Sequence, residues 1–91
     1  MMISVAIAED HDIMRQGIGA LLAHECGARI VGDTGDGLAV LPLVREHAPD
    51  VLILDLSMPG LNGLDVLRKI REHEPATRTI VLSMHSERSE E

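Results

Sequence analysis

The sequence predicts an α/β domain in which helices cover both faces of a parallel β-sheet. Short apolar runs, typical of buried strands, alternate with stretches whose apolar residues recur at helical spacing. The connections between these segments are short, and strand–helix alternation with short connections favours a parallel sheet. The 91 residues are enough for one small domain, so we treat residues 1–91 as a single unit.

The first strand and helix are predicted at Ile3–Ala8 and Ile13–His24. Asp12 precedes the helix and is placed to cap its N-terminus. The apolar residues of this helix fall at helical spacing and predict its inner face: Met14, Ile18, Leu21 and Leu22.

A second strand and helix are predicted in the middle of the chain. The strand covers Ala28–Val31, and the glycine-rich segment Gly32–Gly37 is predicted as a turn. Leu38–His47 is the second helix, although Pro42 would lose a backbone hydrogen bond within it. We therefore expect the regular part to begin nearer Leu41.

The third strand, Val51–Leu54, is apolar without alternation, as expected for a strand covered on both faces. Asn62–His73 is the third helix, and Pro75 follows its end. Its inner face is predicted from spacing to contain Leu64, Leu67 and Ile70. Ile80–Leu82 is a fourth strand.

Composition narrows the kinds of partner and compartment. The net charge is −7 and Lys69 is the single lysine, so this segment is not expected to bind nucleic acid directly. The chain has no Phe, Tyr or Trp, so aliphatic residues and Met must fill its core. Cys26 is the single cysteine, which fits a reducing compartment. No apolar run approaches the roughly 20 residues of a membrane span, and we predict a cytoplasmic protein without membrane segments.

Polar side chains follow three of the four predicted strands. Glu9 and Asp10 follow the first, Asp55 the third and Ser83 the fourth. In open parallel sheets, ligands bind beyond the carboxyl ends of the strands. If the first and third strands are neighbours, three carboxylates converge there, and each pair at about 4 Å repels by roughly 4 kcal/mol. Such a cluster persists where a hard cation such as Mg²⁺ binds it, or where protonation removes a charge.

Three segments resemble the receiver domains of two-component response regulators, in the LuxR/NarL-type subfamily. They are residues 8–22 (AEDHDIMRQGIGALL), 55–70 (DLSMPGLNGLDVLRKI) and 80–87 (IVLSMHSE). The resemblance implies a flavodoxin-like (CheY-like) doubly wound sheet with strand order 2-1-3-4.

The resemblance also implies a chemistry. Asp55 would accept a phosphoryl group from a sensor histidine kinase or a small phosphodonor, and the output of a longer parent would be transcription. Mg²⁺ would be held by Glu9, Asp10, Asp55 and the backbone carbonyl of Ser57. Ser83 would donate a hydrogen bond to the phosphoryl group. Such a domain takes part in its own modification and is not a turnover enzyme.

Members of this family continue into a further helix, strand and helix, with a Lys and an aromatic residue on the fifth strand. Neither residue is present here, so we expect a piece truncated after the fourth strand and ending in a polar tail, residues 86–91. The fourth strand would then be an exposed edge, and we expect a homodimer or swapped oligomer through the region from Thr79 onward.

Two other function classes stay open. An interaction module made by truncation would bind a partner without being phosphorylated. An aspartate-nucleophile phosphatase would need a second Asp two residues after Asp55, where Ser57 stands. Among the five histidines, which show no ligand spacing, His11 lies nearest the predicted site.

Overall fold

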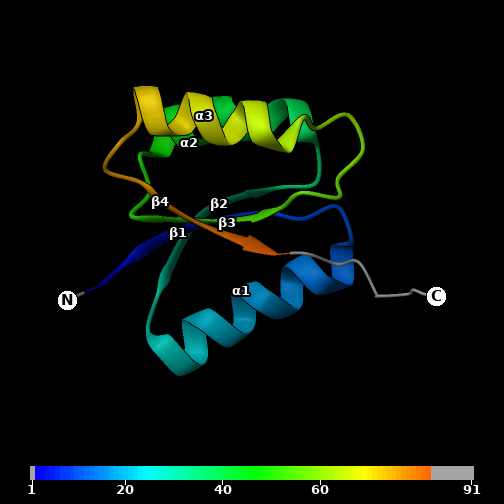
Figure 1. Ribbon diagram of the computed structural model, residues 1–91. Helices are drawn as coiled ribbons and strands as arrows, with labels where there is room; N and C mark the ends of the chain where they lie inside the picture. The colour runs from blue at the N-terminus through cyan, green and yellow to red at the C-terminus, as the bar shows by residue number, and fades with distance from the viewer. Residues whose placement is uncertain (1, 83–91) are drawn as a thin grey trace.

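The computed structural model describes residues 2–82, which form a four-stranded parallel sheet with helices on both faces (Figure 1). The strands are β1 (Ser4–Ala8), β2 (Arg29–Thr34), β3 (Val51–Asp55) and β4 (Arg78–Leu82). Their order is β2-β1-β3-β4, and every neighbouring pair is parallel. The predicted fold and strand order are confirmed.

The helices divide between the two faces of the sheet. They are α1 (Asp12–Cys26), α2 (Val40–His47) and α3 (Gly63–His73), and a short 3-10 helix, η1 (Gly37–Ala39), leads into α2. Figure 1 places α2 and α3 together above the sheet and α1 below it. None of the helices within residues 2–82 combines the length and the apolar character that a bilayer crossing requires.

Strand β2 is longer than predicted, because Gly32 lies inside it rather than in a turn. The register with β1 shifts there: Val5 pairs with Ile30, and Ala6 pairs with Gly32. A Cβ atom on Gly32 would lie 2.7 Å from Leu43 Cδ1 of α2. The glycine therefore serves the close approach of a helix to the strand and does not end the strand.

The helix starts follow local hydrogen bonding. Asp12 is the first residue of α1, and the extended residue before it is His11, so the prediction of Asp12 as the N-cap was wrong. At α3, Asn62 is the N-cap, and its side chain accepts a hydrogen bond from the backbone N–H of Asp65. Pro42 lies in the first turn of α2, where its missing N–H costs no helical hydrogen bond.

The predicted inner faces of α1 and α3 are only partly correct. Ile18 and Leu22 of α1 pack against the buried core, whereas Met14 is 38% exposed and Leu21 is 61% exposed. In α3, Ile70 is buried, but Leu64 in the first turn is 77% exposed. Helical spacing alone does not fix which apolar side chains contact the sheet.

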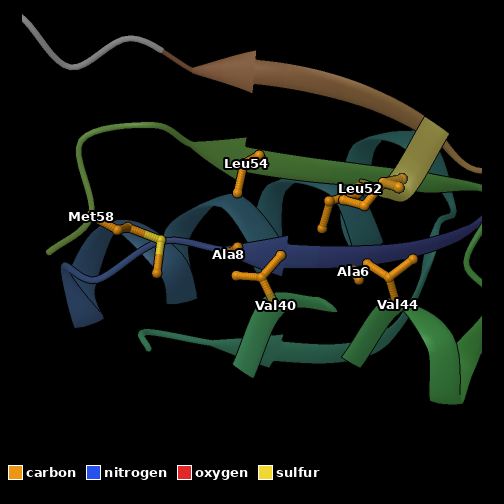
Figure 2. Close-up of a cluster of buried hydrophobic side chains, with 8 residues drawn as sticks. Ala6, Ala8, Val40, Val44, Leu52, Leu54 and Met58 are labelled. Carbon is orange, nitrogen blue, oxygen red and sulfur yellow. The ribbon is translucent and has the colours of Figure 1, made fainter. Parts of the chain in front are cut away.

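Two apolar clusters fill the space on either side of the sheet. On the α2 and α3 side, the buried residues are Ala6, Ala8, Val40, Val44, Leu52, Leu54, Met58 and Ile70. Figure 2 shows Val40 and Val44 of α2 directed at the small side chains of β1. Val5, Ile7 and Ile53 form the cluster on the α1 side. Because β1 carries Ala6 and Ala8 on its upper face, α2 can lie close to the sheet without aromatic residues filling the gap.

A hydrogen-bonded clasp joins β1 to β3 at their amino ends. We use this name for Ser4 and Asp50, whose side chains each bond the other residue's backbone N–H. Asp50 Oδ2 accepts from the Ser4 backbone N–H at 2.9 Å and from its hydroxyl at 3.1 Å. Ser4 Oγ accepts from the Asp50 backbone N–H at 2.9 Å. The clasp therefore helps to fix the register in which β1 and β3 run together.

Candidate functional site

The acids that follow β1 and β3 meet at the carboxyl edge of the sheet. Ala8 pairs with Leu54 in the parallel register, so the residues that follow them, Glu9 and Asp55, emerge side by side. β1 lies between β2 and β3, which is the point where the strand order reverses. Ligands of doubly wound sheets bind at this switch point.

One atom from each of Glu9, Asp10, His11 and Asp55 can be chosen so that all four atoms lie within 4.8 Å of one another. Glu9 and Asp55 are completely buried, although carboxylates are almost never buried without a partner. The side chain of Asp10 is 26% exposed and that of His11 is 65% exposed. The cluster thus has a buried floor of two carboxylates and a side open to solvent.

Each carboxylate of the cluster keeps one buried oxygen that accepts no hydrogen bond from residues 2–82: Glu9 Oε1, Asp10 Oδ1 and Asp55 Oδ2. Asp10 Oδ1 lies 3.3 Å from His11 Nδ1, which is ion-pair range without hydrogen-bond geometry. Leaving a buried charged acceptor unsatisfied costs more than about 1–3 kcal/mol. Three such oxygens on the carboxylates of one cluster fit a hard divalent cation, which prefers carboxylate ligands.

His11 contacts the same acids. Its backbone N–H donates to Glu9 Oε2 at 3.0 Å, and its ring Nδ1 lies 2.7 Å from the same oxygen. The hydrogen bond to Glu9, together with the negative charge of Asp10, raises the pKa of the His11 imidazole above its ordinary value of 6.5. When protonated, the His11 imidazole carries the positive charge nearest to the acid cluster among the described residues.

Ser57 holds one oxygen of the Asp55 carboxylate. Its backbone N–H donates to Asp55 Oδ1 at 2.9 Å, and its hydroxyl donates to the same atom at 2.7 Å. Both bonds are to Oδ1, so the orientation of the carboxylate is fixed while Oδ2 stays free of protein donors. The structure thus leaves one oxygen of a buried aspartate available to a further ligand.

Arg15 is a contributor to the site that the sequence did not single out. Its Nη1 donates to the backbone carbonyl of Glu9 at 2.7 Å, and its Nη2 donates to Asp12 Oδ1 at the same distance. The side chain is only 18% exposed and passes over the loop at Gly35, where an added Cβ would lie 2.8 Å from Nη1. The i,i+3 spacing of Asp12 and Arg15 was an available signal for this ion pair.

The structure brings together the predicted residues Glu9, Asp10 and Asp55, with Ser57 beside them. Ser83 and the tail 86–91 lie outside the described residues. The role of the Ser57 carbonyl stays a prediction. Cys26 is exposed and forms no disulfide.

Comparisons of the sequence and of the structure with known proteins point to the same family. The family model of the response regulator receiver domain matches residues 5–91. The solved signal receiver domain of NarL from Mycobacterium tuberculosis superposes with a TM-score of 0.85 at 36% identity. That alignment covers 96% of this chain and 70% of the NarL domain.

Two curated relatives are transcriptional regulatory protein DegU of Brevibacillus brevis and response regulator UvrY of Escherichia coli K12. DegU is 34% identical over 87 residues, which is 96% of this chain and 37% of DegU. UvrY is 36% identical over 86 residues, which is 94% of this chain and 39% of UvrY. The chain therefore spans less than two fifths of the length of these relatives.

Proposed function

The chain belongs to the response regulator receiver domain family, of the LuxR/NarL type, and from this premise we propose that Asp55 accepts a phosphoryl group in a Mg²⁺-dependent reaction. Family membership confirms the resemblance noted in the sequence. The proposed roles of individual residues rest on the geometry of the site.

One observation carries the proposal: Asp55 is completely buried within a cluster that contains two further carboxylates, yet its Oδ2 accepts no hydrogen bond from residues 2–82. A structural aspartate at a strand end normally bonds nearby backbone N–H groups with its free oxygens. An unsatisfied oxygen in an acidic pocket is instead available to a cation or an electrophile.

In the proposed reaction, a lone pair of Asp55 Oδ2 attacks the phosphorus atom of the donor. The bond from phosphorus to the donor breaks, the leaving group keeps the bonding pair, and an acyl phosphate forms on Asp55. Ser57 holds Oδ1 through two hydrogen bonds, so it orients the attacking oxygen. A phosphohistidine of a sensor histidine kinase or acetyl phosphate would serve as donor.

Glu9, Asp10 and Asp55 are the residues that would hold Mg²⁺, with the Ser57 carbonyl as a further ligand. When bound, the ion offsets the charge that builds up on the transferring group. We further propose that Ser83, which follows β4, donates a hydrogen bond to the phosphoryl group. Arg15 would keep the Glu9 backbone in place through its bond to the carbonyl.

The chain is proposed to be modified once per signalling event rather than to turn over substrate. Lys69, its single lysine, lies in α3 and forms an ion pair with Asp65 at 3.1 Å, so it is engaged on the helix surface. Lys69 is therefore not proposed as a contact of the phosphoryl group.

The test is incubation of the chain with acetyl phosphate and Mg²⁺, followed by intact mass spectrometry and hydroxylamine treatment. We expect the mass of one added phosphoryl group, removed by hydroxylamine as acyl phosphates are. Asp55→Asn should abolish the addition, and chelation of Mg²⁺ should suppress it. Glu72→Gln, which removes an exposed carboxylate of α3, is the matched control and should be modified like the parent chain.

A chain that binds Mg²⁺ but is never modified would instead support the interaction module. The phosphatase alternative lacks its second acid, because Ser57 occupies that position and uses its hydroxyl to bond Asp55. Release of many equivalents of inorganic phosphate per protein chain would favour the phosphatase alternative.

Partners, an output and a location are also part of the proposal. A sensor histidine kinase would be the phosphodonor, transcription the output and the cytoplasm the location. Self-association through the region from Thr79 onward stays a prediction. In the described residues β4 pairs with β3 on one side, and its Ile80 is 52% exposed. Light scattering at high protein concentration measures it, and a clean monomer would contradict it.

A further inference from the structure

The acid cluster contains a nitrogen ligand that a purely oxygen-based magnesium site does not need. We propose that His11 Nδ1 is a metal ligand, so that the site binds a borderline divalent transition metal ion such as Co²⁺ or Zn²⁺ more tightly than Mg²⁺. The inference rests on the proposed metal site. It adds to that site a fourth side chain and a choice of ion.

The imidazole lies among the carboxylates of the cluster. A ring nitrogen of His11 is one of four ligand atoms that lie within 4.8 Å of one another. Nδ1 itself is 3.3 Å from Asp10 Oδ1. Metal–ligand bonds of about 2.0–2.2 Å place adjacent ligand atoms about 3.0–3.4 Å apart. The contact with Glu9 Oε2 is shorter, 2.7 Å, and is a hydrogen bond that a bound ion would replace.

The carboxylates of the cluster also include buried oxygens without hydrogen-bond donors. Glu9 Oε1 and Asp55 Oδ2 belong to completely buried side chains and accept no hydrogen bond from residues 2–82. Buried carboxylate oxygens without donors favour a bound cation whether or not a histidine is nearby. The histidine therefore does not create the site but changes which ion fits it best.

The backbone holds the imidazole toward the acids. The His11 N–H donates to the same Glu9 oxygen that its ring contacts, and His11 immediately precedes α1. Its side chain is nevertheless 65% exposed, so the imidazole lies on the solvent side of the buried Glu9 carboxylate.

The chemistry of the ligand set gives the selectivity. Mg²⁺ is a hard ion that prefers oxygen, so an imidazole adds little to its binding. Co²⁺ and Zn²⁺ accept imidazole readily and bind mixed nitrogen and oxygen sites more tightly than harder ions do. His11 should therefore affect the affinity for Co²⁺ and leave that for Mg²⁺ nearly unchanged.

The test is calorimetric titration of Mg²⁺ and of Co²⁺ into the chain without a histidine tag, and into His11→Gln and His24→Gln. His24, in the last turn of α1, is the control for removal of an exposed histidine away from the acids. We expect His11→Gln to weaken Co²⁺ binding by about tenfold or more, since loss of even an outer partner of a ligand costs 10- to 100-fold. Mg²⁺ binding should change less than about twofold, and His24→Gln should change neither.

Proton NMR of the Co²⁺-loaded chain reads the ligand directly. A histidine bound to Co²⁺ gives a strongly shifted, exchangeable imidazole N–H resonance, which should be present in the parent and in His24→Gln and absent from His11→Gln. Far-UV circular dichroism checks the fold, and His11→Asn serves if His11→Gln does not fold.

Three results would overturn the inference: Co²⁺ binding no tighter than Mg²⁺ binding in the parent, Co²⁺ binding unaffected by His11→Gln, or an equal loss for both ions. An equal loss for both ions would mean that His11 positions the carboxylates and does not bind the metal ion itself. None of these outcomes bears on Asp55, whose modification with Mg²⁺ is scored separately by mass. A chain that selects Co²⁺ through His11 but is never phosphorylated would refute the proposed function alone.

Discussion

Replacing Asp55 with asparagine should stabilise the protein in the absence of metal ions. The ligand atoms of the cluster lie within 4.8 Å of one another, and the carboxylates of Glu9 and Asp10 both face Asp55. Two ionised carboxylates at that separation repel by about 3.5 kcal/mol at an effective dielectric constant near 20. The positive charge of His11 offsets part of this repulsion.

We expect Asp55→Asn to raise the free energy of unfolding by about 1–3 kcal/mol, less than the full Coulomb term because of that offset. Asparagine keeps the shape of the side chain. Its Oδ1 can still accept the two hydrogen bonds from Ser57, and its amide nitrogen supplies a donor where Oδ2 was unsatisfied.

The assay is urea unfolding followed by far-UV circular dichroism, with and without Mg²⁺. Because the chain has no Trp or Tyr, intrinsic fluorescence cannot report the transition. Without metal, the variant should unfold at higher urea with an unchanged slope. With Mg²⁺, the difference should shrink or reverse, since an ion at 100 times its Kd stabilises the native parent by about 2.7 kcal/mol.

Glu72→Gln is the control for loss of one negative charge on an exposed helix surface, and it should change stability by less than about 0.5 kcal/mol. The reasoning is refuted if Asp55→Asn is no more stable than the parent in metal-free buffer. It is also refuted if Mg²⁺ stabilises both proteins equally, because the ion would then not need the Asp55 carboxylate.

Three further predictions concern the core, a loop contact and pH. Ile70→Ala should lower the free energy of unfolding by about 2–5 kcal/mol, because the side chain is buried. Leu64→Ala on the same helix should change it by less than about 0.5 kcal/mol, because that side chain is exposed. Urea unfolding midpoints measure both changes. Gly37→Ala should lower the free energy of unfolding by about 1–3 kcal/mol, because the added Cβ would lie 3.0 Å from the backbone nitrogen of Leu61. A thermal unfolding midpoint as high as the parent's would contradict this prediction. In metal-free buffer, the raised pKa of His11 means that its contact with Glu9 stabilises the fold fully below pH 6.5, and this stability is lost as pH rises through the folded-state pKa. His11→Gln should therefore lower the urea midpoint at about pH 6 and hardly at about pH 9, and a pH-independent difference would argue against it.

The sequence could predict the architecture because strand and helix patterns are strong in this chain. Val51–Leu54 is continuously apolar, and the structure buries Leu52, Ile53 and Leu54 between helices on both faces. The convergence of Glu9, Asp10 and Asp55 followed from a geometric rule about strand ends, given that the first and third strands are neighbours, which the family resemblance implied.

What the sequence could not predict are features set by tertiary contact. Gly32 signalled a turn, but α2 packs over that position and the strand continues through it. Helical spacing could not tell that Leu21 would face solvent while Leu22 packs. Asp12 was predicted as a helix N-cap, but its side chain accepts a hydrogen bond from Arg15 instead. The same guanidinium donates to the backbone carbonyl of Glu9, so the position of Arg15 depends on a contact that the sequence does not reveal.

The clasp between Ser4 and Asp50 has a consequence at the far end of the sheet. Side chains alternate along a strand, so sliding β3 by a single residue against β1 would turn the Asp55 carboxylate to the opposite surface. The two residues are 46 apart in sequence and lie at the end of the strands remote from the acids, yet their bonds help to decide which atoms meet there. In this fold, the arrangement of the acids at the carboxyl edge of the sheet depends on a strand register that is fixed at its amino edge.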